Sequence, residues 1–178
     1  MLGSGSTVGP QAEAVPFKSK ITTDAFTNCL IRDHQAIFGM GCLAHICKEF
    51  EIRFKDESSN RAAFYELQAF GLYAIADGVR TQCGQRLRDV ILVRLNEKFA
   101  NMSGPNWEMF RRRVAEYEES GSDAPNGGLA AQRIFDRPTG VIEPDSMAAF
   151  GLSHAMNASY CDALQAVERL FKHYTVEV

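Results

Sequence analysis

Three stretches of the chain contain no Asp, Glu, Lys or Arg, and each of them contains a Phe-Gly pair. The stretches are residues 34–47 with Phe38-Gly39, residues 67–76 with Phe70-Gly71, and residues 146–161 with Phe150-Gly151. A large ring beside a residue without a side chain lets two helices approach closely. The spacing of the pairs is unequal, so they do not define a repeat. We therefore predict three helices that meet in one apolar core.

The length of the chain, 178 residues, fits a single domain that buries about 70% of its unfolded surface. Residues 1–16 are rich in Gly, Ser, Pro and Ala, which predicts a flexible tail before a helical domain at 17–178. The formal net charge is −3, and acidic and basic residues are interspersed. This charge excludes nucleic acid as the main partner, because phosphate binding needs a basic surface.

No secretory signal and no apolar run of about 18 residues is present, so we expect a soluble protein that is neither exported nor inserted in a membrane. The chain has five cysteines, an odd number, and no Cys-x-x-Cys pair. Buried free thiols in a reducing compartment explain this pattern best. We therefore predict a cytoplasmic location.

Apolar residues recur at helical spacing along most of the chain, and no convincing alternating strand pattern is present. A long first helix is predicted from Thr22 or Thr23 to about Phe54. Further helices are predicted from Ser58 or Ser59 onward, over residues 87–99, 107–117 and 129–135, and from 146 to about 174, with a kink or break between Gly78 and Gly84. The expected fold is an all-α, single-domain bundle of about five to six helices with one or two long central helices.

One candidate site is a ligand pocket between the uncharged helix segments. Small residues beside aromatic rings either pack helices together or leave a cavity, and the pattern does not distinguish these outcomes. The residues that would line such a pocket are Phe38, Met40, Phe70, Tyr73, Phe150, His154 and Met156. A small molecule, a metal or a cofactor of unknown identity would bind there.

A second candidate site is the line of Cys42, His45 and Glu49, spaced three and four residues apart on one helix face. Thiol, imidazole and carboxylate groups are metal ligands, and Glu49 would also orient His45. The favoured alternative is a small core thiol, a half-buried imidazole and a solvated carboxylate. No motif for nucleophilic catalysis or nucleotide binding is present, so no catalytic residue is predicted.

Two further charged groups are expected to be structural. The run Arg111-Arg112-Arg113 covers most of a helix circumference, and we expect it to form solvated pairs with Glu108 and Glu116. Asp77 is expected to be a polar residue at the predicted kink.

These observations favour a non-enzymatic helical interaction or regulatory module that self-associates as a homodimer through exposed faces of the first or last helix. A protein partner is a further possibility. The alternative is the ligand-binding bundle described above, and an enzyme built on His45 and Glu49 has the least support.

Overall fold

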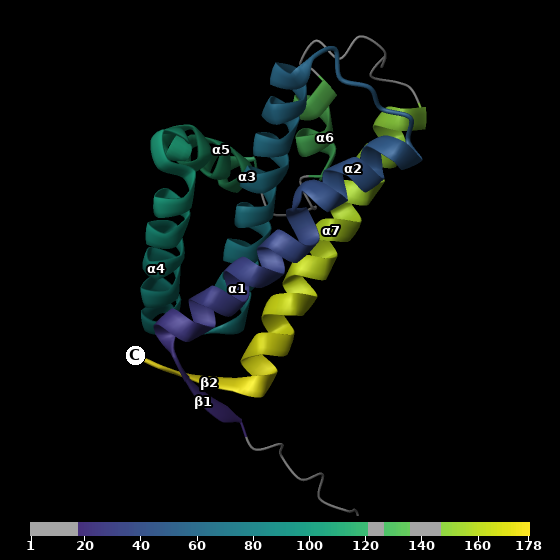
Figure 1. Cartoon of the computed structure of the whole chain (residues 1–178). Helices are drawn as coiled ribbons and strands as arrows, with labels where there is room; N and C mark the ends of the chain where they lie inside the picture. Colours follow the sequence, from purple (N-terminus) through teal and green to yellow (C-terminus); the bar gives the residue numbers. More distant parts are fainter. Residues whose placement is uncertain (1–17, 121–126, 136–146) are drawn as a thin grey trace, which may run out of the picture.

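The computed structural model describes residues 18–120, 127–135 and 147–178, and it confirms an all-α helical bundle (Figure 1). The predicted tail, residues 121–126 and the predicted start of the last helix at residue 146 lie outside the described residues. The elements are β1 (Ser19–Thr22), α1 (Thr23–Phe38), α2 (Met40–Glu49), α3 (Glu57–Gln82), α4 (Gln85–Ser103), the 3-10 turn η1 (Gly104–Asn106), α5 (Trp107–Glu119), α6 (Gly127–Phe135), α7 (Met147–His173) and β2 (Tyr174–Glu177).

The predicted first helix is wrong in extent, because the chain breaks at Gly39 into α1 and α2. Thr22 caps α1 as expected, and its hydroxyl accepts from the Ala25 backbone N–H at 3.3 Å. Gly39 has extended backbone angles, and a Cβ placed there would clash with the Gln35 carbonyl oxygen. At the break, the Gln68 side-chain amide donates to the Phe38 carbonyl. The apolar spacing continues across Gly39, which is why it predicts one helix.

The central element is α3, whose uncharged stretch fills the core of the bundle. Every residue of 67–76 is buried except the half-buried Gln68. The helix is in contact with α1, α4, α5, α6 and α7. It continues through Gly78 without a kink and ends at Gln82, so the predicted break between Gly78 and Gly84 lies at Cys83 and Gly84. A Cβ at Gly78 would already touch Val167 of α7 at 3.0 Å, so this glycine serves close packing.

The three Phe-Gly pairs do not play one common role. Phe38 and Phe70 are fully buried, and their ring centroids lie 6.2 Å apart in an edge-to-face arrangement. Gly71 packs directly against Phe38. Phe150, by contrast, is 70% exposed, so the prediction that it belongs to the core is wrong. In this third pair only the glycine is buried, and Gly151 packs against the ring of Phe50.

A small parallel sheet joins the two ends of the described chain, at one end of the bundle (Figure 1). Ser19 pairs with Tyr174 and Thr22 with Glu177, and Lys20 forms an ion pair with Glu177 at 2.8 Å. Each strand has only four residues, and the two strands come from opposite ends of the described chain. Local periodicity in the sequence therefore does not predict them. Among the described residues, no helix combines the length and apolar character needed to cross a membrane.

Candidate functional site

The residues predicted to line a ligand pocket separate into a buried group and an exposed group. Phe38, Phe70, Tyr73 and Met156 lie in the packed core, whereas Met40, Phe150 and His154 lie on the surface. Tyr73 stacks between the rings of Tyr117 and Tyr160, with centroid distances of 5.6 and 5.9 Å. The structure therefore does not bring the seven residues together around one site.

The predicted metal triplet is also divided. His45 and Glu49 are exposed, and their Nε2 and Oε2 atoms lie 3.5 Å apart as a surface ion pair. Cys42 is half-buried instead and hydrogen-bonds with Ser159 of α7, and burial raises the pKa of its thiol. Among the described residues, no three His, Cys, Asp or Glu side chains are arranged to hold a metal ion. The triplet thus has the geometry of its favoured alternative, except that the His45 imidazole is exposed instead of half-buried.

The uncharged exposed residues in the first half of α7 form a more coherent surface, which we call the α7 face. It consists of Met147, Phe150, His154, Ala158 and Cys161. The spacing of three and four residues places all five side chains on one side of the helix. Met147 is 83% exposed and Phe150 is 70% exposed, so two large apolar side chains lie in solvent. Isolated exposed apolar residues are ordinary, whereas neighbouring ones on the same side of a helix are a feature of interaction surfaces.

The charge pattern changes abruptly along the exposed side of α7. The exposed positions that follow Cys161 are polar or charged, namely Asp162, Gln165, Arg169, Lys172 and His173. Both halves of the helix have buried partners on the opposite side, including Met156 and Val167. Solvent exposure alone therefore does not explain the missing charges in the first half.

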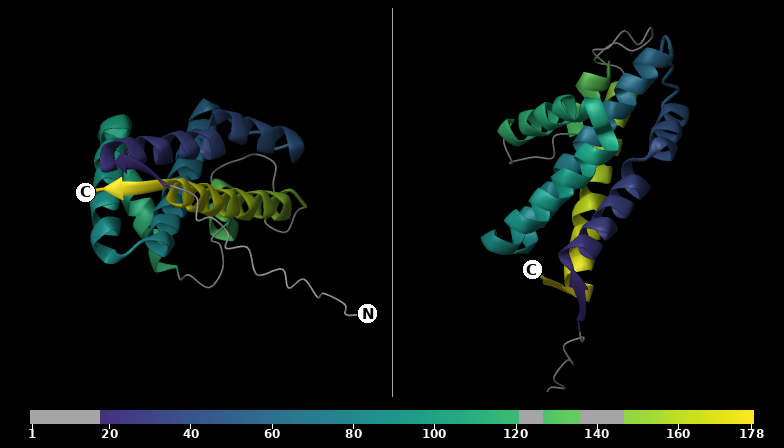
Figure 2. Two further views of the ribbon diagram at one scale, coloured as in Figure 1. Left: turned by 90° about the horizontal axis from the view of Figure 1, so that it is seen from below. Right: turned by 60° about the vertical axis from the view of Figure 1, so that its left-hand side comes forward.

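Residues of α7 that lie beside the α7 face contact two other helices. Seen from below in Figure 2, α7 runs between α2 and α6. On one side, Cys42 of α2 hydrogen-bonds with Ser159. On the other, the Gly127 backbone N–H of α6 donates to the Asn157 side-chain oxygen at 3.0 Å. These contacts leave the α7 face itself exposed, and α7 is packed mainly against α3 and α6.

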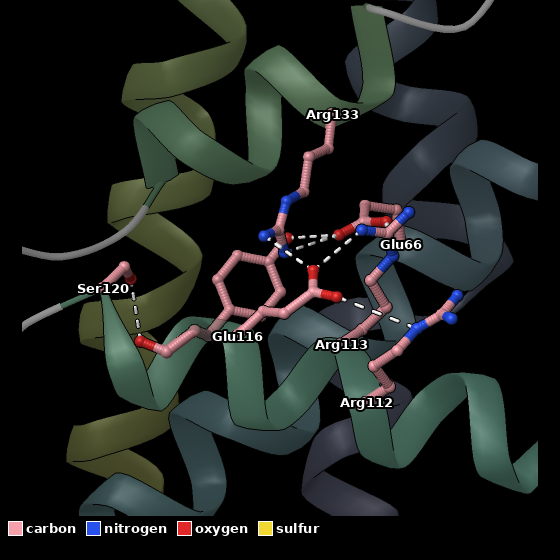
Figure 3. Close-up of polar contacts among 7 residues, drawn as sticks. Glu66, Arg112, Arg113, Glu116, Ser120 and Arg133 are labelled. Atoms are coloured by element: carbon pink, nitrogen blue, oxygen red, sulfur yellow. Dashed lines mark hydrogen bonds and ion pairs between the residues drawn. The ribbon is translucent and has the colours of Figure 1, made fainter.

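A buried polar junction links α3, α5 and α6 (Figure 3). Glu66 of α3 is 1% exposed, and its carboxylate accepts a 2.5 Å hydrogen bond from the Tyr117 hydroxyl. Arg113 and Arg133 approach the same carboxylate at 3.4 and 3.6 Å. Both guanidinium groups also pair with Glu116, at 2.8 and 2.9 Å. The expectation that the Arg111–Arg113 run is entirely solvated is therefore wrong for Arg113.

The same junction contains a cation–π contact and ends in a surface pair. The Arg133 guanidinium carbon lies 4.7 Å from the centre of the Tyr117 ring. Arg112 points outward and meets Glu116 at 3.8 Å, while Ser120 donates to the Tyr117 carbonyl (Figure 3). Residue spacing carries no signal for this junction, because its members come from three separate helices.

The tyrosines of the core act as neutral hydrogen-bond donors. Burial, followed by the nearby Glu66 carboxylate, raises the pKa of Tyr117 well above its ordinary value. Burial and Asp77 raise the pKa of Tyr160 in the same way, and the Tyr160 hydroxyl donates to Asp77 at 2.5 Å. Asp77 thus fastens α3 to α7. Groups held neutral in this manner stabilise the packing of the bundle and are not poised for acid–base catalysis.

His34 of α1 is a further buried ionisable group of the core. Its Nε2 lies 3.1 Å from the Gln68 carbonyl oxygen, and its ring meets Phe99 edge-on at 4.8 Å. Burial lowers the pKa of His34 to about 4, so the imidazole is neutral at physiological pH. It joins α1 to α3 and α4.

Comparison with protein-family models, with curated proteins and with solved structures gives no match. Of the features above, the buried ionisable groups each have at least one partner within the bundle, although His34 Nδ1 has no hydrogen-bond partner. The α7 face is a surface of the described residues whose uncharged composition is not explained by packing among those residues.

Proposed function

We propose that this protein is a non-enzymatic helical interaction module that self-associates as a homodimer through the α7 face. The observation that carries the proposal is the symmetry of that face about His154. Phe150 and Ala158 lie four residues on either side of His154, and Met147 and Cys161 lie seven residues on either side. An antiparallel second copy of α7, related by a two-fold axis at His154, meets the same positions in reverse order.

This arrangement pairs large side chains with small ones. Phe150 faces Ala158 of the partner subunit, and Met147 faces Cys161 of the partner subunit. Alternating large and small residues interdigitate as knobs and holes between helices. From Met147 to Cys161 the helix rises about 21 Å, which is long enough for a helix-pairing seam.

The absence of charge supports a second copy as the occupant of this surface. In a two-fold interface each patch meets itself, so any net charge on the patch would repel its own copy. The α7 face has no Asp, Glu, Lys or Arg, whereas the rest of the exposed side of the helix does. An uncharged surface also does not fit a nucleic acid or an anionic membrane as the partner.

The thiols are compatible with a cytoplasmic protein. All five cysteines lie within the described residues and are free. Four of them are half-buried, and burial raises the pKa of Cys42, Cys47 and Cys83. Unpaired cysteines are typical of a reducing compartment.

The test is a charge placed on the α7 face. Phe150→Glu sets two like charges into the proposed seam, and Val93→Glu is the matched control because Val93 is an exposed apolar residue of α4. Size exclusion with light scattering over a dilution series should give twice the 19.8 kDa chain mass for the parent and for Val93→Glu, and the single mass for Phe150→Glu. A parent protein that is monomeric at tens of micromolar, or two variants that behave alike, would refute the proposal.

A second experiment tests the antiparallel orientation. Met147→Cys introduces a thiol that should form a disulfide with Cys161 of the partner subunit under mild oxidation. Parallel pairing would instead join Cys161 to Cys161 of the partner subunit in the unmodified protein, and the antiparallel arrangement separates these two thiols by about 21 Å. Peptide mapping of the oxidised dimer identifies the linked residues.

A further inference from the structure

A cavity of about 140 Å³ lies between α3, α4 and α5, away from the α7 face. Its apolar lining comes from all three helices and includes Leu72 and Ala76 of α3, Leu92 of α4, and Trp107 and Val114 of α5. These five residues are buried or half-buried. A dry apolar cavity of about 150 Å³ accepts one benzene ring in a well-studied engineered protein. The volume here therefore fits a single six-membered ring.

The polar residues of the cavity lie at its mouth. Arg80, Asn96, Arg111 and Glu118 line the same space, and all four are exposed or half-exposed. Arg80 is paired with Glu118 within the rim, whereas the partner of Arg111, Glu108, does not line the cavity, so Arg111 is the rim charge left for a ligand. A ligand with an anionic group beside its ring therefore matches the mouth better than a cationic one.

Arg111 is the rim cation most available to a ligand. Its side chain is 67% exposed, and its partner is Glu108, with an Nη2–Oε2 distance of 3.0 Å. An exposed ion pair of this kind contributes little, so Arg111 exchanges partners readily. Arg80, by contrast, is more buried and is held in an ion pair with Glu118. A planar guanidinium binds a carboxylate through two parallel hydrogen bonds.

We propose that this cavity binds a small aromatic carboxylic acid, with its ring against Trp107 and Leu72 and its carboxylate on Arg111. The size of the cavity limits the ligand to one ring, and the rim selects its charge. The site does not depend on the dimer, so it should be present in the monomeric Phe150→Glu variant as well.

Trp107 provides the measurement, because it is the only tryptophan of the chain and lines the cavity. Its indole N–H gives a single resonance in a proton–nitrogen correlation spectrum. Titration with benzoate should shift this resonance saturably. Benzyl alcohol should bind more weakly, and the benzylammonium ion should bind weakest of the three. A parent spectrum that does not respond to benzoate, or that responds equally to all three probes, would overturn the proposal.

Two variants separate the ring site from the charge site. Ala76→Leu fills the cavity and should abolish the benzoate response, and Ala115→Leu fills it from α5 if the first variant does not fold. Arg111→Gln should weaken benzoate binding roughly tenfold and leave benzyl alcohol binding unchanged. Arg112→Gln is the matched control, since Arg112 is an exposed neighbour that pairs with Glu116 and does not line this cavity. Equal binding by the filled variants and the parent, or equal losses in the two arginine variants, would refute the site.

Discussion

Gly71 is a position where the structure opposes even the addition of one methyl group. A Cβ placed on Gly71 would lie 2.5 Å from both Cγ and Cδ2 of Phe38 and 2.7 Å from Nε2 of His34. Both neighbours are fully buried. The clashing atoms of Phe38 are at the base of its ring, so no rotation of a flexible chain end relieves the contact. Gly71→Ala therefore has to push α1 away from α3.

The size of the effect follows from opposing contributions. Overpacking a core contact costs about 1–3 kcal/mol. Displacing His34 also weakens its 3.1 Å hydrogen bond to the Gln68 carbonyl, which adds about 1 kcal/mol. Removing a glycine from a helix interior stabilises by up to about 1 kcal/mol. The net expectation is a decrease of about 1–3 kcal/mol in the free energy of unfolding.

The measurement is urea denaturation followed by circular dichroism, in the Phe150→Glu background so that self-association does not change the result. Gly41→Ala is the matched control, because Gly41 lies in α2 and a Cβ there meets no atom within 4 Å. That variant should be neutral or slightly more stable. Adding Phe38→Leu to Gly71→Ala should recover part of the loss if the ring is the obstacle. A Gly71→Ala protein as stable as Gly41→Ala would contradict the packing argument.

Three further predictions concern other parts of the bundle. Glu66→Ala should lose about 3 kcal/mol in denaturant titration, because it leaves two arginine charges short of a buried partner, whereas Glu57→Ala at an exposed pair should lose at most about 0.5 kcal/mol. The pKa of His34 is about 4 in the folded protein and 6.5 when unfolded, so the unfolded state takes up the proton first and stability is lost as pH falls from 6.5 towards 4. The expected loss is about 2 kcal/mol at about pH 5, and a pH series of melts without such a decrease contradicts the buried neutral imidazole. Cys161, the one exposed thiol of the five, should react quickly with a thiol reagent in Phe150→Glu and slowly in the parent dimer, and equal rates would count against the α7 seam.

The sequence by itself determined the fold class and most of the helices. Helical spacing of apolar residues, the Thr22 cap and the break near Gly84 depend on neighbours within a few residues, so they can be recognised without tertiary contacts. The close-packing roles of Gly71 and Gly151 were also predictable, because a glycine in an uncharged helix segment allows another side chain to pack directly against the helix backbone. The break at Gly39 was missed because the apolar pattern continues across it.

Only the tertiary structure decided which uncharged side chains became core and which stayed on the surface. Periodicity shows that Met147, Phe150 and His154 share one side of a helix, but not whether another helix covers that side. The neighbours α2 and α6 leave it open, so Phe150 and His154, predicted to line a pocket, belong to the α7 face instead. The ion pair between Glu66 and Arg113 could not be predicted from the sequence for the same reason. Contacts between helices depend on how whole helices pack, and they produce no fixed residue spacing along the chain.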